Sequence, residues 1–79
     1  MKTTAALKKR LFEELKASGF RKENVLIVNQ QTTLMRSLSL NYAEFVDLMH
    51  LLQDEGYCTI GSDRGHEVYK LTAKVEEEY

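Results

Sequence analysis

The chain has no proline and no tryptophan, and it contains a single cysteine, four glycines and no long hydrophobic run. One cysteine excludes an internal disulfide, which fits a reducing cytoplasm. The longest apolar run is VLIV at 25–28, far short of the roughly 20 residues that cross a bilayer. The N-terminal stretch has no central apolar block, so no secretion signal is expected. We therefore expect a cytoplasmic protein with no membrane partner.

A basic excess is also missing. Lysine and arginine number 11 and aspartate and glutamate 12, for a net charge of −1. Domains that bind nucleic acid are usually basic, because phosphate neutralisation supplies most of their non-specific affinity. The 79 residues form one domain, 1–79. A domain this small buries only about 60% of the surface that its unfolded chain exposes, so a homodimer or a stabilising partner is compatible with its size.

The first half of the chain contains one clear helix and one short apolar run. Leu7, Leu11 and Leu15 recur at every fourth position, which predicts a helix from about Thr4 to Ser18. Gly19 then occupies the position of a left-handed residue that ends a helix. The run at 25–28 is rich in β-branched residues and predicts a buried strand.

Residues 30–38 fit two patterns. A short helix capped by Asn29 or Thr32 would present Leu34, Met35 and Leu38 to a core. A strand that pairs back on 25–28 would also account for the alternating leucines. We favour the helix; the strand would give an α-β-β-α-β-β order instead.

The segment 42–55 has the best local signals for a helix. Asn41 is a good N-cap and Glu44, three residues later, completes a capping box. Leu40 and Phe45 form the matching hydrophobic staple, and Gly56 ends the helix. The expected core stripe is Phe45, Leu48, Met49 and Leu52.

Residues 57–72 predict a β-hairpin that turns at Asp63 and Gly65, and Thr72 can begin a last helical turn. The whole order predicts a small α+β domain of about three helices followed by a C-terminal hairpin.

Two segments, LMRSLSLNYAEFVDLMHLLQDEGYCTI at 34–60 and HEVYKLTAKVEEEY at 66–79, together resemble winged helix-turn-helix domains. The resemblance implies that helix 42–55 enters the major groove of double-stranded DNA and that the hairpin contacts the DNA backbone. It also implies a transcriptional regulator, which we expect to be of the compact kind that mobile elements carry.

Helix 42–55 departs from that pattern, because Leu38 to Ile60 contains no lysine or arginine. Bases are read mainly by arginine, lysine, asparagine and glutamine, whereas carboxylates are repelled by phosphate. The alternative function is therefore a protein-interaction module that does not bind DNA and that meets a basic protein partner. Its candidate residues are Glu44, Asp47, His50 and Asp54.

Cations elsewhere in the chain are the candidates for contacts with nucleic acid. Lys2, Lys9 and Lys16 recur every seven residues on one helix face, and Arg64 sits at the tip of the expected hairpin. Each of these residues also fits an ordinary solvated surface. The full set of candidates is Lys2, Lys9, Arg10, Lys16, Gln31, Arg36 and Arg64.

The sequence shows no pattern for catalysis, a cofactor or a metal. His50, Cys58 and His66 lack the spacing of zinc ligands, and no nucleophile, paired-carboxylate or phosphate-loop motif is present. We expect no enzyme, no cofactor and no metal site.

Overall fold

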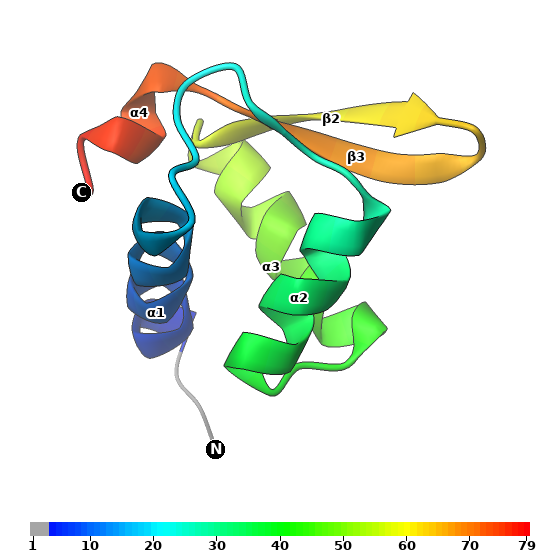
Figure 1. The fold of residues 1–79 in the computed structure, drawn as a ribbon, viewed down its shortest axis with the longest axis horizontal. Helices are drawn as coiled ribbons and strands as arrows, with labels where there is room; N and C mark the ends of the chain where they lie inside the picture. Colours follow the sequence, from blue (N-terminus) through cyan, green and yellow to red (C-terminus); the bar gives the residue numbers. More distant parts are fainter. Residues whose placement is uncertain (1–3) are drawn as a thin grey trace.

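The computed structural model describes residues 4–79, and its helices and strands follow one another in the order helix, strand, helix, helix, hairpin, helix (Figure 1). The elements are α1 (Thr4–Ala17), β1 (Val25–Leu26), α2 (Val28–Leu38), α3 (Tyr42–Asp54), β2 (Cys58–Asp63), β3 (His66–Leu71) and α4 (Ala73–Glu76). The predicted α+β class, with helices followed by a C-terminal hairpin, is confirmed. Residues 28–38 are helical, so the α-β-β-α-β-β alternative is wrong.

The three strands form one antiparallel sheet in the order β1-β3-β2. β1 pairs with the far end of β3, Val25 opposite Lys70 and Leu26 opposite Tyr69. Helices α1, α2 and α3 lie on one side of the sheet, and its other face carries no helix (Figure 1). The core therefore lies between the helices and the inner face of the sheet.

The prediction of a buried strand over 25–28 is wrong for most of its length. Only Val25 and Leu26 are in a strand, and only Leu26 is buried. Ile27 and Val28 are 46% and 43% exposed. α2 begins at Val28, ahead of the predicted caps, because the Gln30 side-chain oxygen accepts the Ile27 backbone N–H at 2.9 Å and starts the helix early.

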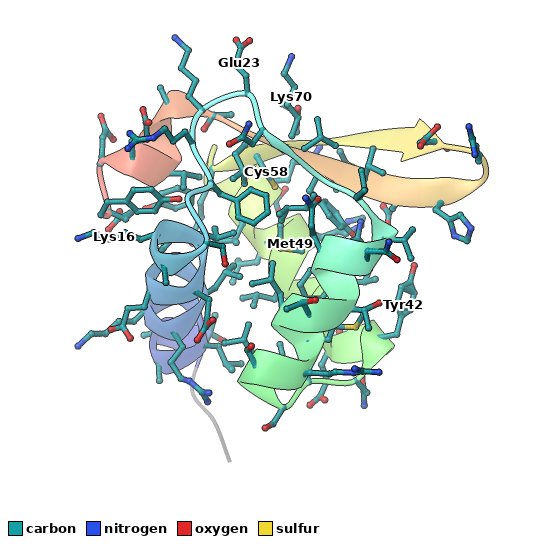
Figure 2. The ribbon with its side chains drawn as sticks, viewed as in Figure 1. Lys16, Glu23, Tyr42, Met49, Cys58 and Lys70 are labelled. Atoms are coloured by element: carbon teal, nitrogen blue, oxygen red, sulfur yellow. The ribbon has the colours of Figure 1, made fainter. Side chains whose placement is uncertain are left out.

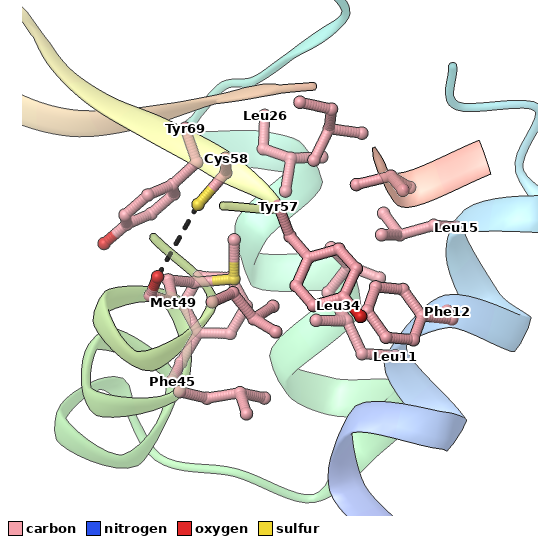
Figure 3. Close-up of a cluster of buried hydrophobic side chains, with 14 of the residues drawn as sticks. Leu11, Phe12, Leu15, Leu26, Leu34, Phe45, Met49, Tyr57, Cys58 and Tyr69 are labelled. Atoms are coloured by element: carbon pink, nitrogen blue, oxygen red, sulfur yellow. Dashed lines mark hydrogen bonds between the residues drawn. The ribbon is translucent and has the colours of Figure 1, made fainter. Parts of the chain in front are cut away.

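The beginning of α3 is as predicted. The Asn41 side chain accepts the Glu44 N–H at 2.8 Å, and Glu44 accepts the Asn41 N–H at 3.0 Å. Phe45 and Met49 are fully buried below it, and the Phe45 and Tyr69 rings are nearly perpendicular, with their centroids 6.0 Å apart. Figure 3 shows this core, in which the Cys58 thiol donates to the Met49 carbonyl at 3.6 Å.

Each of the three long helices ends with one left-handed residue: Gly19 (φ 79°), Ser39 (φ 56°) and Gly56 (φ 88°). The residue after each of these donates its N–H to a carbonyl in the last helical turn, which is the Schellman motif. The bonds are Phe20 to Leu15 at 3.0 Å, Leu40 to Met35 at 2.9 Å and Tyr57 to Leu52 at 2.9 Å. Ser39 is the one member of this trio that is not glycine.

The C-terminal segment folds back over α1. Thr72 is the N-cap of α4, and its hydroxyl donates to the Gly56 carbonyl at 2.6 Å. Val75 is buried in the core, and the Tyr79 hydroxyl donates to the Phe20 carbonyl at 2.6 Å. This segment thereby connects the ends of α1 and α3.

Candidate functional site

A groove of about 350 Å³ runs between α1 and α3. Leu7 of α1, Leu40 of the α2–α3 turn and Leu51 of α3 are half-buried in its floor. Two carboxylates of α3 stand at its rim. The complete lining is Thr4, Leu7, Leu40, Glu44, Asp47, Leu48 and Leu51, and we call it the leucine groove.

The rim of the leucine groove is negative. Asp47 is exposed, and Glu44 uses one carboxylate oxygen to cap α3, which leaves the other for a ligand. The residues that line the groove include no lysine or arginine. An apolar floor beside unneutralised carboxylates is complementary to a segment that carries apolar side chains and a cation. Glu44 and Asp47, candidates from the sequence, therefore line one groove, whereas the leucines around them were predicted only as helix, staple or core residues.

His50, a predicted interaction residue, connects α3 to the hairpin. Its Nε2 lies 2.8 Å from Glu67 Oε1 on β3, although the ring stays about half exposed. The other Glu67 oxygen accepts the Tyr69 hydroxyl at 3.2 Å. Burial, together with the charge of Glu67, raises the pKa of Tyr69. His50 thus helps to hold the hairpin against α3, and it lies outside the leucine groove.

Asp54, the last of the four residues predicted to contact a protein partner, is exposed at the end of α3 and does not line the leucine groove. Its neighbour Glu55 receives two hydrogen bonds from the Lys8 amine, at 2.6 and 2.9 Å. That pair joins α1 to the end of α3 and neutralises the charge of Glu55. The free negative charge is therefore concentrated at Glu44 and Asp47 on one side and at Asp54 on the other.

Two cations of the predicted lysine stripe lie on the opposite side of α1. Lys9 and Lys16 line a second groove, of about 390 Å³, together with Phe12 and Tyr57. Glu13 and Glu78 stand in the same wall, so its charge is mixed. The hydrogen bond that the Tyr57 hydroxyl donates to Glu78, together with burial, raises the pKa of Tyr57 to about 12.

The remaining cations do not line this groove. Arg10 donates to the Ser37 carbonyl at 2.7 Å and so supports the end of α2. Arg36 is exposed in the last turn of α2, and Arg64 is exposed at the tip of the hairpin with φ 53°. Lys16 is on the side of the molecule away from the hairpin tip (Figures 1 and 2). Lys2, the remaining candidate, lies outside the described residues.

Gln31, a candidate for phosphate contact, is in the interior. It is 4% exposed, and its side-chain amide donates to Leu26 O at 2.8 Å and to Glu67 O at 2.9 Å. Both amide hydrogens are used, so Gln31 is not part of a nucleic-acid surface. Its spacing of three and seven residues from Leu34 and Leu38 places it on the core face of α2, a signal that was present in the sequence.

The structure does not bring the histidines and the cysteine together into a metal site. Cys58 is buried, and burial raises its pKa to about 11, which keeps the thiol protonated and unreactive. His50 is paired with Glu67, and His66 is exposed at the start of β3. Within the described part of the chain, no three histidine, cysteine, aspartate or glutamate residues are grouped so as to hold a metal ion.

Comparison with known proteins adds no relative to these observations. The chain matches no family model, no curated protein and no solved structure. Between residues 4 and 79, no helix has both the length and the apolar character needed to span a bilayer.

Proposed function

We propose that this chain is a protein-interaction module on a winged-helix-like scaffold, and that its leucine groove binds a basic, amphipathic segment of a partner protein. The observation that carries the proposal is the composition of the groove: half-buried leucines from two helices and a turn, bordered by Glu44 and Asp47. Apolar anchors supply affinity in such a groove, and a lysine or arginine opposite the carboxylates supplies orientation.

The charge of α3 supports this function over base recognition. Its exposed face carries Asp47 and Asp54, and its histidine is occupied by Glu67. A helix with this face would meet phosphates of its own sign, and the repulsion would grow as salt is lowered. A basic protein surface experiences the opposite effect.

A designed peptide tests the proposal directly. The probe is a fluorescent amphipathic helix of leucine and lysine, and its partner probe has glutamate at every lysine. Fluorescence anisotropy should show saturable binding of the lysine peptide, and at least tenfold weaker binding of the glutamate peptide. The variant Asp47→Lys should reverse this preference. The matched control Asp54→Lys makes the same charge change outside the groove and should leave the preference as it is.

Two outcomes would contradict the proposal. One is no saturable binding of either peptide. The other is an equal effect of Asp47→Lys and Asp54→Lys, since that would mean that the total charge of the domain attracts the peptide and that the groove does not select it.

A second candidate function, a small DNA-binding transcriptional regulator, rests on the hairpin tip. Arg64 is exposed in a left-handed conformation that non-glycine residues rarely adopt, and it takes part in no ion pair within residues 4–79. A side chain in that place can enter a minor groove or contact phosphate. The resemblance to winged helix-turn-helix domains and the cytoplasmic location expected from the sequence fit this function too.

A mobility-shift assay with random duplex in low salt distinguishes the two functions. DNA binding through the tip and α1 predicts that Lys9→Glu combined with Arg64→Glu abolishes the shift, and that Asp47→Ala leaves it intact or strengthens it. Absence of any shift at high micromolar protein would remove this function, because non-specific affinities lie near 10⁻⁴–10⁻⁶ M, about the range that the assay reaches.

A further inference from the structure

No helix covers the outer face of the sheet (Figure 1). Side chains alternate along a strand, and the buried residues Tyr69 and Leu71 point inward, so Val68 and Lys70 of β3 point outward. The register places Lys70 beside Val25 and Thr59, Val68 beside Gly61, and His66 beside Asp63. The outer face therefore consists of three short rows across the strands.

The middle row is apolar and flat. A Cβ atom built on Gly61 would lie 3.6 Å from Cγ2 of Val68, so the glycine is on the same face as Val68 and adds no side chain to it. Val25 is 38% exposed at one margin, and Ile27 and Val28 are exposed at another. Exposed apolar groups that gather at a sheet face are typical of a surface that another protein covers.

Charges on this face alternate in a self-complementary order. Glu23 and Lys70 stand at one end of the sheet and point away from the helices (Figure 2). Glu23 is next to the end of β3, since its N–H donates to the Leu71 carbonyl at 2.8 Å. At the other end Asp63, the last residue of β2, lies beside His66 of β3, and Arg64 follows in the hairpin turn. Read along the strands, the order is negative, positive, apolar, negative, positive.

We propose that two copies of this chain associate through their outer sheet faces about a two-fold axis that runs across the strands along the Val68–Gly61 row. That axis reverses the strand direction and lays the Lys70 end of one sheet over the Asp63 end of the other. β3 then lies over β3 of the second copy, so Lys70 lies opposite His66 and one strand away from Asp63, and Glu23 lies at the same end of the interface as Arg64 of the second copy. Both contacts occur twice, as the symmetry of an isologous interface requires.

The geometry fits known sheet packing. Facing sheets lie about 10 Å apart, and adjacent strands about 4.8 Å apart, so a lysine on β3 reaches diagonally to a carboxylate on β2 of the facing sheet. The absent side chain of Gly61 gives the two middle rows room to approach. The interface shares no residue with the leucine groove, so the dimer can be tested independently of the proposed function.

Complementary charge reversal tests the arrangement. Sedimentation velocity of the full chain should show a concentration-dependent dimer. Lys70→Glu and Asp63→Lys should each weaken self-association at least tenfold, because each puts like charges opposite one another. An equimolar mixture of the two variants should recover a dimer, since a heterodimer restores opposite charges at both contacts. Circular dichroism of each variant checks that it is folded, and Lys16→Glu on α1 is the matched charge control.

Three results would overturn the proposal. The first is a monomer at every soluble concentration. The second is a dimer that Lys70→Glu weakens no more than Lys16→Glu does. The third is a mixture of the two variants that stays as weakly associated as each variant alone, because a dyad along the middle row requires recovery.

Discussion

Replacing Gln31 by methionine should destabilise the domain substantially, although the shape of the side chain is kept. The amide of Gln31 joins two neighbouring strands: it donates to Leu26 O on β1 and to Glu67 O on β3. β1 contains only two residues, so the edge of β3 beyond Tyr69 has no strand partner on that side. Gln31 supplies the hydrogen bond there that a longer β1 would have supplied.

The magnitude follows from the surroundings of the two carbonyls. Each lost hydrogen bond lowers the free energy of unfolding by about 0.5–1.5 kcal/mol, and a carbonyl left without water or another donor lowers it by about 1–3 kcal/mol more. The Leu26 carbonyl stays dry because its residue is fully buried, whereas the partly buried Glu67 carbonyl can be hydrated. We expect a total of about 2–6 kcal/mol, of which each 1 kcal/mol lowers Tm by about 4–8 °C in a domain of this size.

Urea unfolding followed by circular dichroism measures this change. Arg36→Met, on the exposed side of the same helix, is the control and should stay within about 0.5 kcal/mol of the original chain. If Gln31→Met lowers the free energy of unfolding by less than about 1 kcal/mol, the two hydrogen bonds together contribute no more than one ordinary solvent-exposed hydrogen bond. The proposal that Gln31 replaces a longer β1 as the partner of β3 would then be wrong.

Three further predictions concern stability. Ser39→Gly should stabilise the domain by about 0.5–1 kcal/mol in urea unfolding. The left-handed conformation costs a serine about 1–2 kcal/mol, and glycine removes that cost but loses more backbone entropy on folding, which offsets part of the gain. Destabilisation would mean that the serine side chain is needed. Leu52→Ala should cost about 2–5 kcal/mol in the same assay, as the truncation of a buried side chain. The raised pKa of Tyr57, about 12, means that the folded state holds this proton more tightly, so stability should fall as pH rises from 10 towards 12. Tyr57→Phe should flatten that fall in Tm measured against pH, and an unchanged slope would contradict the assignment.

Local chemistry explains why α3 could be predicted in detail. Asn41, Glu44 and Gly56 act on backbone groups within four residues of themselves, so their effect is readable from the sequence. The two acidic rim residues of the groove were predicted for the same reason, because the face of a helix follows from its period.

Contacts between distant segments explain what could not be predicted. The run at 25–28 has the composition of a strand, yet β3 pairs with only its first two residues, and the rest of the run begins a helix. The leucine groove needs Leu7 and Leu51 to meet across two helices, and His50 acquires its partner from β3. None of these neighbours is fixed by spacing along the chain.

The way in which the long helices end has a consequence for amide hydrogen exchange. Phe20, Leu40 and Tyr57 lie just outside helices, but each donates its N–H to a carbonyl of the last turn. Their amides should therefore exchange with deuterium slowly, at rates set by the opening of the helix that precedes each one. Each long helix thus has an amide that reports its own opening, so the order in which the helices open could be followed without an attached probe.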